Sequence, residues 1–243
     1  MLPDLDIWLN HFEYHAQSRR TPPEDLADDL TDDERRLIAR SIATFQLGEQ
    51  SEGRSLLRAA RRFAERRGTP DLVRITELFI REEQHHAALL GEFMDRHGIP
   101  RKQREWTDRA FRRLRKLAGY ELCVTVLVTA ELIGYVYYRA LEVATKCKRL
   151  RVLCRMLVAD ELAHIGFESD VLLAMRASKP PFSRVVTELA HRTLLISTAV
   201  VVWFSHRAVL RRAGYRMSTF LAACDAQYRF YFGQAAPKLA SDP

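Results

Sequence analysis

The sequence has few cysteines, and their spacing excludes several kinds of site. Only four occur among 243 residues, and no two of them form a Cys-x-x-Cys pair: Cys123, Cys147, Cys154 and Cys224. A disulfide framework, a zinc ribbon and a rubredoxin-type iron site are therefore not expected. Scattered cysteines of this kind are typical of a reducing compartment, so we predict a cytoplasmic protein.

Targeting signals and very long hydrophobic runs are also lacking. The first residues, MLPDLDIWLN, contain no basic segment followed by an apolar one, so we predict no secretory signal. The most apolar stretch, TLLISTAVVVWF at 193–204, is shorter than the roughly 20 residues that span a bilayer. We interpret it as a buried helix and predict no transmembrane segment, with contact at a membrane surface as the alternative.

Acidic residues are outnumbered by basic ones. The chain has 31 Asp and Glu against 38 Lys and Arg, which gives a formal net charge of +7. The densest basic segment is RKQREWTDRAFRRLRK at 101–116. This segment could attract nucleic acid, an acidic carrier protein or electron donor, or an anionic substrate tail, or it could form a solvated face.

Helical signals extend over nearly the whole chain. Thr31 and Glu34 have the spacing of a capping box, and RGTPD and HGIP are typical of helix ends. We predict helices over about 5–18, 31–67, 70–97, 107–116, 120–145, 149–177, 183–212 and 217–234. Because short connections between long helices favour antiparallel neighbours, we expect a single all-α domain over 1–243. It would have a four-helix core at about 31–177 and a C-terminal helical extension at about 182–235.

Two of the core helices carry a carboxylate on their apolar face and a histidine three residues later. These Glu-x-x-His pairs are Glu83 with His86 and Glu161 with His164. Residues three apart lie on the same face of a helix, so each pair points toward the predicted core. A buried carboxylate is costly unless it is paired, protonated or bound to a metal.

The other two core helices interrupt their apolar faces with a carboxylate alone. One helix carries Glu131, and the other carries Glu49 and Glu52, between which helix geometry leaves the choice open. One carboxylate from each of two helices, plus a Glu-x-x-His pair from each of two others, is the ligand set of bundles that hold two iron or two manganese ions. A pair of cations would cancel the charge of four buried glutamates.

Four segments together resemble the ferritin-like di-metal carboxylate superfamily, in particular its O2-activating oxygenase and oxidase branch. The segments are GEQSEGR, EEQHH, AELIGYVYY and DELAH, and the resemblance covers about residues 35–175. It implies a ferritin-like antiparallel four-helix bundle with additional N- and C-terminal helices. The metal ligands that it implies are Glu49, Glu83, His86, Glu131, Glu161 and His164.

The resemblance also bears on residues around these ligands. The segment GEQ is similar to the first-ligand segment of aldehyde-deformylating oxygenases and rubrerythrins, which favours Glu49 and leaves Glu52 as the alternative ligand. Glu82 and Asp160 lie where relatives keep a carboxylate that orients a ligand histidine through its other ring nitrogen.

Aromatic and apolar residues near the ligands are candidates for a substrate pocket. Those that would shield the centre from water are Phe45, Phe79 and Leu157. Tyr135 and Tyr138 could line the pocket or act as redox-active phenols, although core packing is the preferred interpretation. His11 and His15 could bind a metal, but an exposed amphipathic helix is preferred there.

The resemblance implies a non-haem di-iron oxygenase or oxidase. Two iron ions, with an Mn–Fe pair as the alternative, would activate O2 to hydroxylate, N-oxygenate, desaturate or cleave a small organic or carrier-bound substrate. Electrons would come from an external donor such as a ferredoxin, because the sequence has no flavin or NAD motif. The oligomeric state is left open, a homodimer included.

Two other functions remain as alternatives. One is iron oxidation or peroxide removal, as in ferritins and rubrerythrins, although the four-cysteine module of rubrerythrins is missing and the C-terminal extension could obstruct a cage. The other is a di-iron hydroxylase that modifies tRNA, with nucleic acid as a partner that we do not favour.

Overall fold

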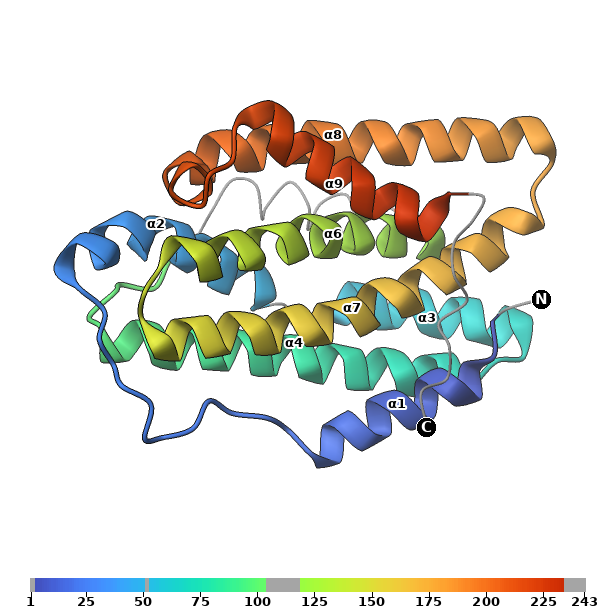
Figure 1. The fold of residues 1–243 in the computed structure, drawn as a ribbon. Helices are drawn as coiled ribbons and strands as arrows, with labels where there is room; N and C mark the ends of the chain where they lie inside the picture. Colours follow the sequence, from blue (N-terminus) through green and yellow to red (C-terminus); the bar gives the residue numbers. More distant parts are fainter. Residues whose placement is uncertain (1–2, 51–52, 104–118, 234–243) are drawn as a thin grey trace.

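The structure is a computed structural model that describes residues 3–50, 53–103 and 119–233. Every regular element within these ranges is a helix, which confirms the predicted all-α class. The helices are α1 (Leu5–Gln17), α2 (Asp32–Glu49), α3 (Arg54–Arg67), α4 (Asp71–Arg96), α6 (Tyr120–Ala144), α7 (Lys148–Ala177), α8 (Pro181–Arg212) and α9 (Met217–Phe232) (Figure 1). The helix predicted around 107–116 lies outside the described residues.

The start of α2 is defined by its cap. The Thr31 hydroxyl accepts a hydrogen bond from the Glu34 backbone N–H, and the Glu34 carboxylate accepts one from the Thr31 backbone N–H, so the predicted capping box forms. The other Glu34 oxygen accepts a hydrogen bond of 2.6 Å from the Lys146 backbone N–H. The cap therefore also ties the start of α2 to the connection between α6 and α7.

The prediction of a single helix over 31–67 is wrong, because the structure has two separate helices there, α2 and α3. Gly53 has a φ of 62°, in the left-handed region, and this conformation interrupts the right-handed helix. A Cβ at Gly53 would clash with the side chain of Ile80 on α4. The glycine thus permits both the turn and the close approach to α4.

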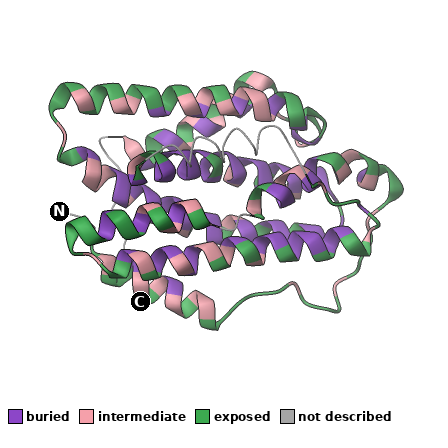
Figure 2. Ribbon diagram, turned by 180° about the vertical axis from the view of Figure 1, so that it is seen from behind, coloured by how far each residue is buried: buried purple, intermediate pink, exposed green. Residues whose placement is uncertain are grey.

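The helices pack in layers around α6. Figure 1 shows α4 and α7 running side by side below α6, with α2 and α3 following one another in sequence along the same core. Helices α8 and α9 lie on the opposite side of α6, and α1 packs on α4. Figure 2 shows that the inner helices are buried on most sides, whereas the outer helices are exposed on one face.

Two of the described helices are long and apolar enough to cross a membrane. They are α6, whose most apolar window is 78% buried in the protein, and α8, whose window is 33% buried. The stretch 193–204 lies within α8, the helix predicted over about 183–212, and the apolar window of this helix is longer than the stretch alone. Only one face of it is buried, through residues such as Leu195, Ala199 and Trp203.

Candidate metal centre

The two Glu-x-x-His pairs meet between α4 and α7. Glu83, His86, Glu161 and His164 each offer one donor atom, and these four atoms all lie within 4.8 Å of one another. His164 Nδ1 lies 3.1 Å from Glu83 Oε1 and 3.7 Å from Glu161 Oε2, and His86 Nδ1 lies 3.5 Å from Glu83 Oε1. The spacing of each pair on its helix turns both side chains toward the facing helix.

The same four donor atoms are buried without hydrogen bonds. Glu83 Oε1, His86 Nδ1, Glu161 Oε2 and His164 Nδ1 have no hydrogen-bond partner among the described residues, because their short contacts lack the required alignment. Buried polar atoms in folded proteins are nearly always satisfied. Two carboxylate oxygens and two imidazole nitrogens that converge in this way fit a metal ion, which would complete all four.

The charged groups of this cluster shift one another's pKa values. Burial opposes the charged form of His86, but Asp160 and Glu83 outweigh it and raise the pKa of His86 to about 10. Burial likewise opposes ionised Glu83, yet His164 and His86 hold its pKa well below the usual range. His86 therefore carries a proton that metal binding would displace.

Glu49 of α2 and Glu131 of α6 face the same centre from the other side. Both line the cavity that Glu83 and Glu161 also line. Burial, followed by repulsion from Glu83 and Glu161, raises the pKa of both carboxyls well above the ordinary value. Four glutamates so close together repel one another when ionised, so protonation of Glu49 and Glu131 lowers this repulsion.

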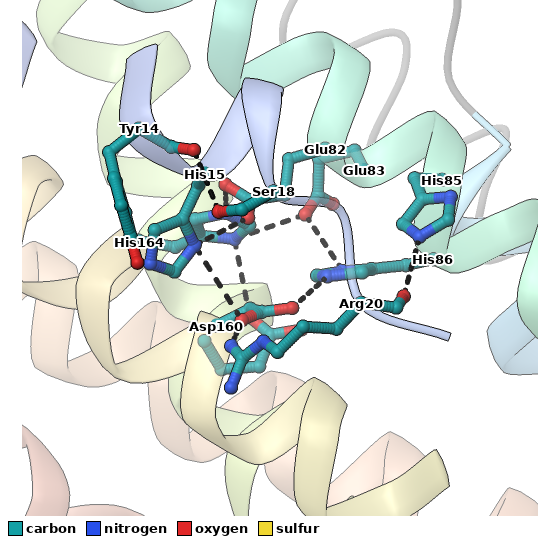
Figure 3. A network of polar contacts seen from close by, with 11 residues as sticks. Tyr14, His15, Ser18, Arg20, Glu82, Glu83, His85, His86, Asp160 and His164 are labelled. Carbon is teal, nitrogen blue, oxygen red and sulfur yellow. Dashed lines mark hydrogen bonds and ion pairs between the residues drawn. The ribbon is translucent and has the colours of Figure 1, made fainter. Parts of the chain in front are cut away.

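Each histidine is also held by a carboxylate of the opposite helix. His86 Nε2, on α4, lies 3.2 Å from Asp160 Oδ2 on α7, and His164 Nε2, on α7, lies 3.2 Å from Glu82 Oε2 on α4. Figure 3 shows these crossed pairs. They leave the Nδ1 atom of each ring to face the cluster.

A second layer of contacts comes from α1 and the residues after it. His15 Nδ1 lies 3.1 Å from Glu82 Oε1, and Arg20 forms an ion pair with Asp160 (Figure 3). Although burial opposes it, hydrogen bonds from His15 and His164 hold the pKa of Glu82 well below its usual range. The interpretation of His15 as part of an exposed helix missed this contact, because periodicity does not indicate which helix α1 packs against.

A cavity of about 190 Å³ adjoins the four glutamates. Its wall is mostly apolar and includes the predicted pocket residues Phe45 and Phe79. Helix α8 closes one side with residues that the sequence analysis did not place at the site: Thr198, Val201, Val202, Ser205 and His206. The apolar stretch 193–204 contains Thr198, Val201 and Val202, and Ser205 and His206 follow it directly, which was their only signal in the sequence.

The other predicted site residues lie around this cavity rather than on its wall. Tyr138 is fully buried, and its hydroxyl donates a hydrogen bond to Glu49 Oε1. Leu157 is buried in the core, and the hydroxyl of Tyr135 accepts a hydrogen bond of 3.1 Å from Arg139. Glu52, the alternative ligand, lies outside the described residues.

Comparison with known proteins finds no matching family model, no matching curated protein and no matching solved structure. The functional argument therefore depends on the geometry of the site itself.

Proposed function

We propose that this chain is a ferritin-like di-metal protein that uses two iron ions to activate O2 and to oxidise an apolar organic substrate. The observation that carries the proposal is the buried group of Glu83, His86, Glu161 and His164, whose unpartnered donor atoms converge within 4.8 Å. Glu49 and Glu131 would complete the set of six ligands from the cavity side.

The charges of the donor set suit a pair of divalent ions. Four ionised glutamates carry four negative charges, which two divalent cations would balance, while neutral imidazoles add nitrogen ligands. Mixed imidazole and carboxylate ligands suit iron and also allow manganese. When bound, the iron pair would supply the oxygen chemistry, with electrons from an external donor such as a ferredoxin.

The protein residues would orient the ligands and keep water out. Asp160 and Glu82 fix the two imidazole rings through their Nε2 atoms, and the Tyr138 hydroxyl fixes Glu49. The apolar wall of the cavity, including Phe45 and Phe79, would hold an apolar substrate beside the glutamates and exclude solvent. Such a cavity favours oxidation of an organic molecule over iron storage.

Metal loading tests the proposal. Metal-free protein treated anaerobically with Fe²⁺ is expected to retain about two ions per chain and to consume O2 afterwards. His86→Ala and Glu161→Ala are expected to lose bound iron and O2 consumption. His85→Ala is the matched control, because His85 is the neighbouring histidine and is partly exposed, with its Nε2 atom 3.0 Å from the Arg20 carbonyl oxygen.

Two outcomes would contradict the proposal. Folded wild-type protein that retains no iron would remove the metal centre altogether. Iron loading with assembly into a very large hollow shell would instead support the storage alternative. Measurement of the particle size in solution distinguishes such a shell from a small oligomer.

A further inference from the structure

A second cluster of metal-ligating side chains lies at one end of the bundle, away from the glutamates. Asp28 belongs to the connection between α1 and α2, His97 is the C-cap residue of α4, and Cys147 is the N-cap residue of α7. Figure 1 shows that these three segments meet at the same end of the molecule. One carboxylate, one imidazole and one thiol are thus brought together from distant parts of the sequence.

The donor atoms of the three side chains converge. A carboxylate oxygen of Asp28, a ring nitrogen of His97 and the Sγ atom of Cys147 all lie within 4.8 Å of one another. His97 Nε2 is buried and lies 2.7 Å from Asp28 Oδ1, yet the two atoms lack the alignment of a hydrogen bond. This orientation is better explained by two metal ligands that point toward the same ion than by a hydrogen bond between the two side chains.

The surroundings hold Asp28 in place while leaving one of its oxygens available. Arg149 Nε lies 3.9 Å from Asp28 Oδ2, the oxygen that does not face His97. The same guanidinium donates hydrogen bonds to the Glu24 and Leu26 carbonyl oxygens, which fixes the connection that carries Asp28. The Asp28 side chain is 33% exposed, so an ion can reach the cluster from solvent.

The thiol of Cys147 is suited to become a metal-bound thiolate. The side chain is fully buried, and burial raises the pKa of the Cys147 thiol. The backbone N–H groups of Leu150 and Arg149 act in the opposite direction, whereas the negative charges of Asp29 and Asp28 raise the pKa further. These N–H groups belong to the first turn of α7, which favours negative charge, and a bound cation would complete the stabilisation of a thiolate.

We propose that Asp28, His97 and Cys147 form a binding site for a single thiophilic divalent cation of the Zn²⁺ type. Cysteine, histidine and aspartate are the ligands that Zn²⁺ takes in proteins, and three of them leave a fourth tetrahedral position for water. The bound ion ties the connection between α1 and α2 to the ends of α4 and α7. The proposal is independent of the function of the glutamate centre.

Cobalt titration tests this site, because Co²⁺ takes the place of Zn²⁺ and reports its ligands. The whole chain, reduced and metal-free, is titrated anaerobically with Co²⁺. We expect a thiolate-to-cobalt charge-transfer band that saturates during the titration and is lost when Zn²⁺ is added. The six proposed ligands of the glutamate centre contain no sulfur and cannot produce this band.

Matched variants assign the band to its ligands. Cys147→Ala is expected to lose the band, whereas Cys154→Ala, which replaces an equally buried cysteine of α7, is expected to retain it. Asp28→Asn, at a partly exposed position, should weaken Co²⁺ binding by about tenfold or more. Folded wild-type protein that gives no band, or a band of equal intensity in Cys147→Ala, would overturn the proposal.

Discussion

At the scale of single residues, the imidazole rings of the proposed centre depend on partners from across the helix interface. Asp160 holds His86, and Glu82 holds His164, each at 3.2 Å. A carboxylate behind a ligand histidine fixes the orientation of its ring and increases its basicity. These two residues should therefore matter for metal affinity without touching the metal.

We predict that Asp160→Ala weakens metal binding by about 10- to 100-fold, because His86 would lose the contact that orients its ring. Calorimetric titration of metal-free protein with Mn²⁺ measures the change without redox chemistry. Asp95→Ala is the control, since Asp95 is an exposed carboxylate whose ion-pair partner is Arg101. Equal affinity in Asp160→Ala and the wild type would contradict the proposed role.

A different buried histidine should make stability depend on pH. His191 is 1% exposed, and burial, followed by repulsion from Arg176, lowers its pKa from 6.5 to about 3. Between these two values the unfolded chain binds a proton at His191 that the folded chain does not bind. Stability is thus lost as the pH falls below about 6.5.

At pH 5 we expect His191 to reduce the free energy of unfolding by about 2 kcal/mol, from about 1.5 pH units at about 1.4 kcal/mol each. Denaturant unfolding at pH 7 and pH 5 measures the loss. His191→Gln cannot titrate but can still accept a hydrogen bond from Arg176, so its loss between the two pH values should be smaller. Identical losses in both proteins would exclude His191 as the cause.

At the scale of elements, the break between α2 and α3 depends on Gly53. Its φ of 62° disfavours any residue with a Cβ, and the Ile80 side chain occupies the space that a Cβ would need. Gly68 offers a natural comparison, because its φ is 66° but no atom lies within 4 Å of the position of a Cβ. Substitution of the two glycines therefore distinguishes the effect of backbone strain from that of steric overlap.

We predict that Gly68→Ala lowers stability by about 1 kcal/mol through backbone strain alone. Gly53→Ala should lower stability by about 2 to 4 kcal/mol, because overpacking against Ile80 is added to the strain. Thermal or denaturant unfolding measures both effects. Equal losses would mean that the contact with Ile80 has no energetic consequence.

Some helices could be predicted from the sequence and others could not. Helices α4, α6 and α7 each have a long periodic apolar face and clear end signals, and the structure places their ends within a residue or two of the prediction. The separation of α2 from α3 could not be predicted, because the apolar pattern continues across Gly53. The sequence does not show that Gly53 takes a left-handed conformation or that the Ile80 side chain lies against it.

At the scale of the whole molecule, the cavity exists because α8 covers the glutamate centre. Val201 and Val202 of α8 line it together with Phe45 and Phe79 of the core helices. The Glu-x-x-His spacings predicted that each pair would face the core, since that follows from helix periodicity, and the resemblance implied that the two pairs would meet. The cavity could not be predicted, because its shape results from packing between helices distant in sequence.

We predict that the cavity binds small apolar molecules and that Val202→Trp abolishes this binding by filling it. An apolar cavity of similar size accepts benzene, so the increase in melting temperature that benzene causes is a suitable measurement. Val200→Trp is the control, because Val200 is the near neighbour on α8 that does not line the cavity. Iron loading should be unchanged in both variants, and a benzene effect that persists in Val202→Trp would place the binding elsewhere.

The crossed hydrogen bonds between α4 and α7 also set the register of these two helices. A slide of α4 along α7 by one turn, about 5.4 Å, would separate His86 from Asp160 and His164 from Glu82 at the same time. Such a slide would therefore release both rings together. If the proposed metals are bound, shear between the helices and loss of the metals would be a single cooperative event.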